Sequence, residues 1–257
     1  VSVNLGKADG ILSENEQVKG EEFEPTQRIK VYILEVKETP KGPRILVSRT
    51  HPGLVKRLFE SEVAEVRDGT VEIKSIAREA GSRTKIAVWS NDPDVDPVGA
   101  CVGMNGARVN SIVEELNGEK IDIINWDENP AILIENALSP AKVIAVMADP
   151  DEKTALVVVP DYQLSLAIGK EGQNARLAAR LTGFKIDIKS ETQARESGEL
   201  YDYDEDEEYY EEEEAYSEES ASADEEVSTE DSDKDVVSEE ISEEPAAETV
   251  SEEPVEE

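Results

Sequence analysis

The chain has 257 residues and a formal net charge of −35, with 61 Asp and Glu against 26 Lys and Arg. This length predicts one to three domains with real cores. One cysteine excludes a disulfide framework and fits a reducing compartment, and no apolar run is long enough to cross a membrane. We therefore expect a cytoplasmic protein without a membrane anchor.

Four strands are predicted near the start of the chain, over residues 1–5, 10–12, 28–36 and 44–48. Their β-branched residues alternate or cluster between Gly- and Pro-containing turns. A five-stranded OB barrel needs one more strand, which we expect upstream of Val1. Tyr32 is the one aromatic residue of these strands, so a structural role for residues 1–51 is a real alternative to nucleic-acid binding.

Residues 52–127 follow an α-β-β-α-α-β order. Apolar spacing predicts a helix over 52–63, strands over 70–76 and 84–90, a helical segment over 96–102, a helix after residue 106, and a strand over 120–126.

Residues 128–190 repeat this order. The expected elements are a helix over 131–138, strands over 142–148 and 154–159, helices over 163–168 and 173–182, and a strand over 185–189.

Each of these two units contains two glycines separated by two residues, in Val102-Gly103-Met104-Asn105-Gly106 and Ile168-Gly169-Lys170-Glu171-Gly172. The two loops lie 66 positions apart, and the closing strands, both spelled Lys-Ile-Asp-Ile, lie 65 apart, which indicates a duplication. Glycines let a phosphate approach main-chain N–H groups, and the following helix turns its positive end toward the same phosphate. KH modules bind about four nucleotides of single-stranded RNA in this way. For either loop alone, a plain helix–helix turn is the alternative.

The candidate RNA-binding residues follow from this arrangement. The glycines provide close backbone approach, the basic residues neutralise phosphates, the amides bond phosphates or base edges, and the apolar residues floor the groove. Glu171 repels phosphate and is expected to point outward. The set comprises Val102, Gly103, Met104, Asn105, Gly106, Arg108, Ile168, Gly169, Lys170, Glu171, Gly172, Gln173, Asn174 and Arg176.

The acidic residues are concentrated at the C-terminus. Residues 199–257 hold 29 Asp and Glu and one Lys, a net charge of −28, which leaves 32 acids and 25 bases, a net charge of −7, in the first 198 residues. Such a segment cannot bury enough apolar surface to offset its ordering entropy. We predict a disordered acidic tail over 191–257, which is either a solubilising extension or a mimic of nucleic acid that competes for the basic loops.

No catalytic residue, metal site or cofactor is predicted. Cys101 precedes the first glycine loop as a small core residue, and His51 has no second histidine or cysteine cluster beside it.

Several longer passages carry a resemblance to a known family. They include Ser48-Arg49-Thr50-His51-Pro52, Asp96-Pro97-Val98-Gly99-Ala100-Cys101-Val102-Gly103 and Leu164-Ser165-Leu166-Ala167-Ile168-Gly169-Lys170. From Leu5 to Ser190 the chain resembles the NusA family of bacterial transcription factors. The resemblance implies an α+β protein in which a partial S1-like OB domain precedes two tandem type II KH domains.

The same resemblance implies a non-enzymatic elongation factor that binds nascent single-stranded RNA and modulates pausing, termination and antitermination. Its implied partners are the RNA polymerase elongation complex and other termination or antitermination factors, and we expect a monomer. The family's N-terminal polymerase-binding domain has no counterpart here. Two other classes stay open: an RNA-processing enzyme with KH and S1-type modules, and an acidic chaperone-like protein that binds basic partners.

Overall fold

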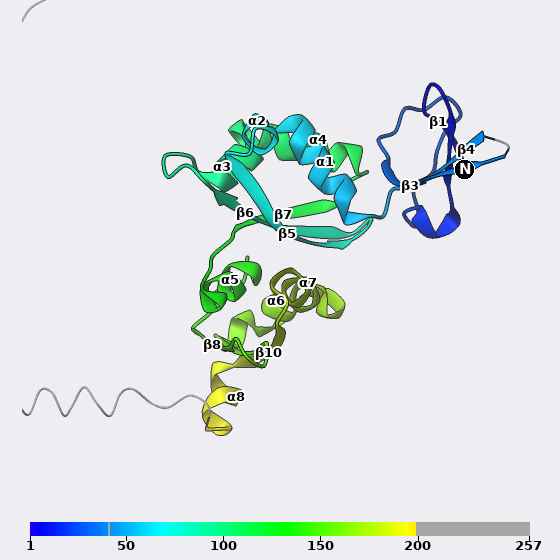
Figure 1. Cartoon of the computed structure of the whole chain (residues 1–257). Helices are drawn as coiled ribbons and strands as arrows, with labels where there is room; N and C mark the ends of the chain where they lie inside the picture. Colours follow the sequence, from blue (N-terminus) through cyan, green and yellow to red (C-terminus); the bar gives the residue numbers. More distant parts are fainter. Residues whose placement is uncertain (41, 199–257) are drawn as a thin grey trace, which may run out of the picture. The chain divides into compact units, whose positions relative to one another are not determined.

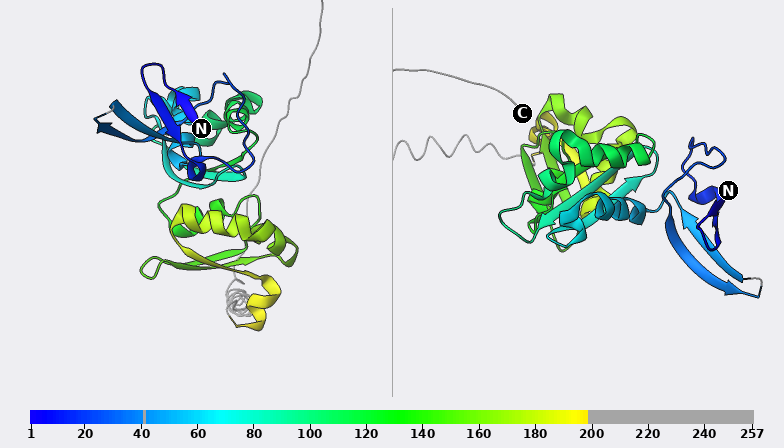
Figure 2. Two further views of the ribbon diagram at one scale, coloured as in Figure 1. Left: turned by 90° about the vertical axis from the view of Figure 1, so that its right-hand side faces the viewer. Right: turned by 90° about the horizontal axis from the view of Figure 1, so that it is seen from above.

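The structure is a computed structural model that describes residues 1–40 and 42–198 (Figures 1 and 2). Within these residues it has one four-stranded and two three-stranded sheets together with helices, in agreement with the expected α+β class. In this part of the chain no helix is long and apolar enough to cross a membrane. The predicted acidic tail lies outside the described residues from position 199 onward. Its predicted start at residue 191 is wrong, because Glu191–Glu196 forms a short helix, α8.

The first sheet has the order β1-β2-β4-β3. Its strands are β1 (Ser2–Asn4), β2 (Asp9–Leu12), β3 (Tyr32–Thr39) and β4 (Gly42–Ser48), with a 3-10 turn, η1 (Glu14–Glu16), after β2. Strands β2 and β4 are parallel, and the other neighbours are antiparallel.

Strand β3 starts four residues later than the strand predicted over 28–36. The reason is visible at Lys30, whose N–H donates to Glu115 Oε1 and whose carbonyl accepts from Arg49. The N–H and the carbonyl of Lys30 are therefore bonded to side chains and do not pair with a neighbouring strand.

The next unit comprises α1 (Pro52–Glu62), α2 (Ala64–Arg67), β5 (Val71–Glu79), β6 (Arg83–Ser90), α3 (Pro97–Val102), η2 (Met104–Gly106), α4 (Ala107–Glu115) and β7 (Lys120–Asn125). Its sheet has the order β5-β6-β7, antiparallel between β5 and β6 and parallel between β6 and β7.

The last unit repeats this topology. It comprises α5 (Pro130–Ala137), β8 (Ala145–Asp149), β9 (Thr154–Val159), η3 (Asp161–Gln163), α6 (Leu164–Ile168), η4 (Lys170–Gly172), α7 (Gln173–Thr182), β10 (Lys185–Ser190) and α8. Strands β8 and β9 are antiparallel, and β9 and β10 are parallel. The repeated helix–strand order expected from the sequence is therefore present.

Three of the helices begin in the same way, with a polar N-cap followed by proline. The side chains of His51, Asp96 and Asn129 each accept a bond from the main-chain N–H two residues later. Proline at the first helical position needs no partner for an N–H and already has a helical φ. These dipeptides set where α1, α3 and α5 start.

Two apolar cores lie on opposite faces of the β5-β6-β7 sheet. On one face Ile86 and Val88 pack against α1 and α4, which cover the sheet in Figure 1. On the other face Ala77 and Ala87 pack in one cluster with residues of α5 and α7 from the following unit. The two units therefore share a continuous core, and the helix after the second glycine loop is fixed against the first unit's sheet.

Candidate nucleic-acid interface

The two glycine loops adopt the same backbone conformation. At the first glycine, φ and ψ are 74° and 174° for Gly103, and 76° and 171° for Gly169. At the second glycine they are 76° and 12° for Gly106, and 71° and 17° for Gly172. Every pair of angles agrees within 5°, so the repeat seen in the sequence extends to the main chain.

The first glycine of each loop is required on two grounds. Its φ is positive, and an added Cβ would lie 2.7 Å from Arg108 Cγ at Gly103 and 2.8 Å from Asn174 Cβ at Gly169. Between the glycines, Asn105 and Glu171 also adopt positive φ, at 52° and 54°. A non-glycine residue in this region costs about 1–2 kcal/mol. Strain held at the same position in both loops is typical of a functional segment.

The loop tips are open to solvent. Met104 is 86 % exposed, and Asn105, Lys170 and Glu171 are also exposed. Ile168, directly before the second loop, is 38 % exposed. An apolar side chain next to an open main-chain loop is the arrangement that a stacked base needs.

Arg108, in the first turn of α4, already has protein partners. Its Nη1 donates to Glu65 Oε2 at 3.0 Å and to the Ala100 carbonyl at 2.6 Å. The side chain is 36 % exposed and supports the back of the first loop. A phosphate can contact the exposed part of the Arg108 guanidinium, where it competes with the Glu65 carboxylate.

Arg176, in the first turn of the helix after the second loop, binds the first unit instead of pointing freely outward. Its Nε donates to Glu79 Oε1 at 2.5 Å and its Nη2 to Glu79 Oε2 at 3.1 Å. Gln173 adds bonds to Glu79 Oε2 at 2.9 Å and to Ser82 Oγ at 2.7 Å. The Arg176 guanidinium, offset in part by burial, lowers the pKa of Glu79 to about 2. These contacts join α7 to strand β5.

Asn174 is buried behind the second loop. It is 5 % exposed, and its Nδ2 donates to the carbonyls of Leu138 and Ala167, each at 3.0 Å. This geometry gives Asn174 a supporting position behind the loop, and its role as a direct ligand of RNA stays a prediction.

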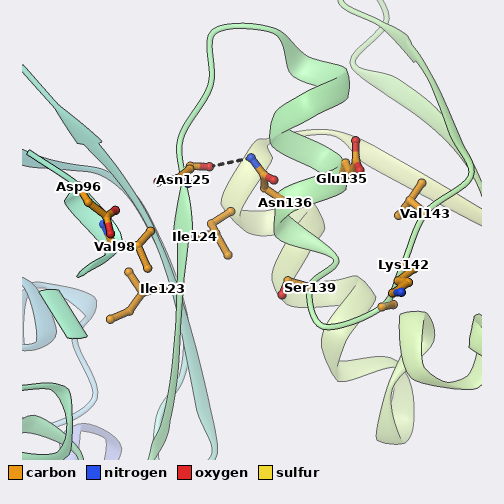
Figure 3. A pocket seen from close by; sticks show the side chains of 11 residues that line it. Asp96, Val98, Ile123, Ile124, Asn125, Glu135, Asn136, Ser139, Lys142 and Val143 are labelled. Carbon is orange, nitrogen blue, oxygen red and sulfur yellow. Dashed lines mark hydrogen bonds between the residues drawn. The ribbon is translucent and has the colours of Figure 1, made fainter. Parts of the chain in front are cut away.

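A cavity of about 670 Å³ lies between the two units (Figure 3). Val98 and Ile123 line one side, and Ser139 and Lys142 line the other. Asp96 and Val98, at the start of α3, line the cavity, and the first glycine loop follows the other end of this helix.

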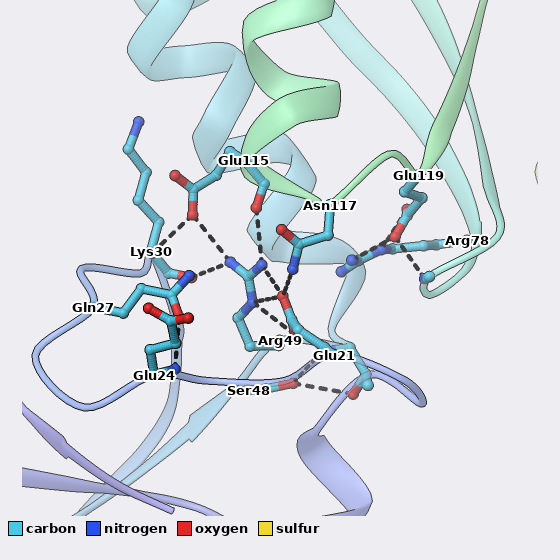
Figure 4. A network of polar contacts seen from close by, with 12 residues as sticks. Glu21, Glu24, Gln27, Lys30, Ser48, Arg49, Arg78, Glu115, Asn117 and Glu119 are labelled. Atoms are coloured by element: carbon cyan, nitrogen blue, oxygen red, sulfur yellow. Dashed lines mark hydrogen bonds and ion pairs between the residues drawn. The ribbon is translucent and has the colours of Figure 1, made fainter.

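Arg49 joins the first sheet to the unit that follows, and the sequence did not assign it a role (Figure 4). It is 1 % exposed, is paired with the Glu21 carboxylate, and donates to the Glu115 carbonyl at 2.9 Å and to Glu115 Oε1 at 3.1 Å. Glu115 ends α4, where a cation is favourable for the helix dipole. Arg49 lies within the Ser48–Pro52 motif, and this motif was the sequence signal that could have marked Arg49 as a structurally important residue.

A second buried pair, Arg78 and Glu119, lies nearby (Figure 4). Two bonds of 2.8 and 2.9 Å connect them, and Glu119 also accepts from Thr84 Oγ1 and the Gly81 N–H. Burial acts to raise the pKa of Glu119, but these bonds outweigh it and the pKa is lowered. The pair fixes the turn between β5 and β6 against the start of β7.

Lys85 makes a further polar contact between the units. Its side chain is buried, and its Nζ donates to the Ser139 carbonyl at 2.8 Å and lies 3.0 Å from Asp122 Oδ2. Burial lowers the pKa of Lys85, and Asp122 acts in the opposite direction.

Comparison with known proteins identifies both units. Residues 49–126 match the family of the NusA-like first KH domain, and residues 130–196 match the NusA-like second KH domain. The two tandem KH domains predicted from the sequence are therefore confirmed.

Curated relatives agree with these matches. The chain is 64% identical over 198 residues, 77% of this chain and 53% of the relative, to the transcription termination/antitermination protein NusA of Bacillus subtilis (strain 168). The corresponding protein of Halalkalibacterium halodurans is 61% identical over 79% of this chain and 53% of the relative. That of Thermus thermophilus is 48% identical over 80% of this chain and 51% of the relative. The chain spans about half the length of the curated relatives it matches.

Proposed function

The chain belongs to the NusA family, and we propose that it binds nascent single-stranded RNA through its two glycine loops and acts in transcription termination and antitermination. The observation that carries this proposal is the matched pair of loops, with dihedral angles that agree within 5° and a non-glycine residue with positive φ at the third position of each. Two loops of the same shape suit a ligand that repeats along its length, as a sugar–phosphate backbone does.

The exposed loop residues are the first contacts in this proposal. The main chain at Gly103–Gly106 and Gly169–Gly172 receives phosphates, Lys170 adds a positive charge, and Val102 and Ile168 lie under the bases. Asn105 is placed to bond a phosphate or base edge, and Met104 supplies an exposed apolar surface. Glu171 contributes its main chain, since its carboxylate repels phosphate.

The arginines take a second role. Arg108 and Arg176 are each paired with a glutamate, so RNA has to share or displace Glu65 and Glu79. Gln173 is bonded to the same Glu79. We propose that these residues act mainly by holding α4 and α7 in place and add charge once RNA arrives.

We also propose that the four-stranded sheet is part of an S1-like OB domain. Its support is the mixed topology, in which β2 pairs with β4 in parallel while the hairpin β3–β4 extends beyond them. Contacts with RNA polymerase and with other termination or antitermination factors are proposals of the same kind, drawn from the names of the relatives.

The test is titration of labelled single-stranded RNA with loop variants of the full chain. In one variant Met104 and Asn105 are replaced by Asp, in another Lys170 is replaced by Asp, and a third combines the changes. Carboxylates against phosphate should weaken binding about tenfold or more for the combined variant. Lys56→Asp, on the exposed face of α1, makes the same change of charge as each of the first two variants, so it is their matched control and should change affinity little.

The same titration separates the alternatives. RNA that is bound and stays intact supports the proposal, whereas RNA that is degraded indicates a processing enzyme. If the chain does not bind RNA, or if the combined variant and the parent bind it equally, the proposal is contradicted. The acidic chaperone-like class would then remain.

A further inference from the structure

The two tryptophans of the chain lie side by side at one end of the first KH sheet. Trp89 is in β6, and Trp126 directly follows β7, where its N–H donates to the Val88 carbonyl at 2.8 Å. Because β6 and β7 are parallel neighbours, both rings lie at the same end of the sheet, where these two strands finish. Their centroids are 5.6 Å apart and the rings meet edge to face at 85°.

These rings line a pocket of about 450 Å³. Its walls come from the loop over residues 90–97 and from Asn125 and Asp127, and it is separate from the tips of the glycine loops. Trp89 is 41 % exposed. Tryptophan has a large apolar surface and is rarely left open to water, and exposed aromatics of this kind are enriched where proteins bind partners.

The rim of the pocket is acidic. Asp92 and Asp127 line it, and their Oδ1 atoms accept turn N–H groups from Asp94 at 3.0 Å and Asn129 at 2.7 Å. Within the described part of the chain neither carboxylate takes part in an ion pair. A pocket with aromatic walls and two carboxylates unpaired by cations is complementary to a positive charge.

One cation of the chain already uses this aromatic surface. Lys74 Nζ lies 5.6 Å from the centroid of the Trp126 ring, a cation–π distance, while it pairs with Glu72. Trp126 therefore presents a π-face that accepts an ammonium group, and Trp89, which is 41 % exposed, is a second indole surface in the same pocket.

We propose that this pocket binds an arginine or lysine side chain of a partner protein, with the cation against Trp89 and paired with Asp92 and Asp127. RNA is disfavoured here because the carboxylates repel phosphate. The chain's own residues 199–257 are disfavoured for the same reason, since they carry a net charge of −28. The site is independent of the glycine loops, so the proposal does not depend on RNA binding.

The experiment uses the full chain, because both of its tryptophans line this pocket and no other tryptophan contributes signal. The probe is the blocked tripeptide acetyl-Gly-Arg-Gly-amide, titrated while the two indole N–H resonances are followed by NMR. The matched probe contains citrulline, which has nearly the shape of arginine but no charge. The acidic C-terminal segment also attracts the arginine peptide, but it carries no tryptophan and leaves the indole signals unmoved.

We expect saturable shifts of both indole signals, with the arginine peptide binding about threefold or more tighter than the citrulline peptide. Replacing Asp92 and Asp127 together by Asn keeps the turn-bonding oxygens and should reduce this difference, because only the cation–π contact with Trp89 is left. Asp149→Asn, which removes charge from a carboxylate in a similar turn on the β8–β9 hairpin, is the control and should change nothing.

Three results would overturn the proposal. The first is equal binding of the arginine and citrulline peptides. The second is an unaltered preference for arginine in the Asp92→Asn, Asp127→Asn variant. The third is movement of both indole signals by single-stranded RNA and not by the arginine peptide, which would make the pocket part of a nucleic-acid surface.

Discussion

Arg176 and Glu79 lie 97 positions apart in the sequence and form a two-point ion pair that joins the helix after the second glycine loop to the first KH sheet. The bonds are 2.5 and 3.1 Å long. The same arginine donates to the Glu171 carbonyl inside the second loop at 3.1 Å. One side chain therefore connects the loop that is proposed to bind phosphate with the neighbouring domain.

Glu79→Gln should strengthen RNA binding about two- to fivefold at low salt. Removing the carboxylate charge leaves the Arg176 guanidinium more available to a phosphate, and the gain is small because this guanidinium is 43 % exposed. Glu72→Gln, on the same strand and paired with Lys74, is the control. Titration with labelled RNA measures both, and equal affinities of the parent and Glu79→Gln would show that Arg176 does not take part.

Acid should reduce the contribution of Glu79 to stability. Its pKa is about 2 in the folded chain against an ordinary 4.5, so the carboxylate stabilises the fold above pH 4.5 and loses this effect as the pH falls from 4.5 to 2. The stability gap between the parent and Glu79→Gln should therefore shrink over this window. We expect a gap of about 1–2 kcal/mol at neutral pH, below the full value of the shift because Arg176 is 43 % exposed. Denaturant unfolding at a series of pH values measures it, and a constant gap would contradict the assignment.

Local sequence patterns predicted much of the fold. The features that they did not predict concern residues whose structure depends on long-range contacts. The duplicated G-x-x-G predicted both KH units because glycine and helix signals act over a few residues. The burial of Asn174 depends on the Leu138 carbonyl, 36 positions away. The late start of β3 depends on the Lys30 main chain, which accepts a bond from Arg49 and donates one to Glu115. The residue types at positions 30 and 174 do not indicate which distant residues will be their hydrogen-bond partners.

Arg49→Met should destabilise the chain by about 3–5 kcal/mol, because it leaves the Glu21 carboxylate buried without its cation. The side chain of Glu21 is 3 % exposed, so water cannot replace the guanidinium. Arg57→Met, which removes a 70 % exposed arginine from its pair with Glu60, should cost less than about 1 kcal/mol. Urea unfolding of the two variants gives the comparison, and similar losses would show that the Arg49 cluster is not a structural joint.

Arg108→Ala should lower the slope of log affinity against log salt by about 0.7, the increment for one phosphate contact on a single strand. Its guanidinium is partly exposed beside the first loop, although it is shared with Glu65. The slope is measured from RNA titrations between low and moderate salt, with Arg57→Ala as a control at an exposed arginine of α1 that is paired with Glu60. An unchanged slope for Arg108→Ala would mean that this side chain only supports the loop.

Removal of residues 199–257 should tighten RNA binding several-fold at low salt. These residues carry a net charge of −28 and are covalently attached after the second KH domain, so they oppose RNA either by occupying the basic loops or by general repulsion. Charge effects are screened over about 8 Å at physiological salt, so the difference should diminish as salt rises.

Affinity alone does not separate the two causes, but amide chemical shifts do. If the acidic segment occupies the loops, the resonances of Gly103–Gly106 and Gly169–Gly172 should differ between the full and truncated chains without RNA. Identical loop spectra combined with tighter RNA binding would assign the effect to general repulsion. An affinity that is the same with and without residues 199–257 at low salt would exclude both.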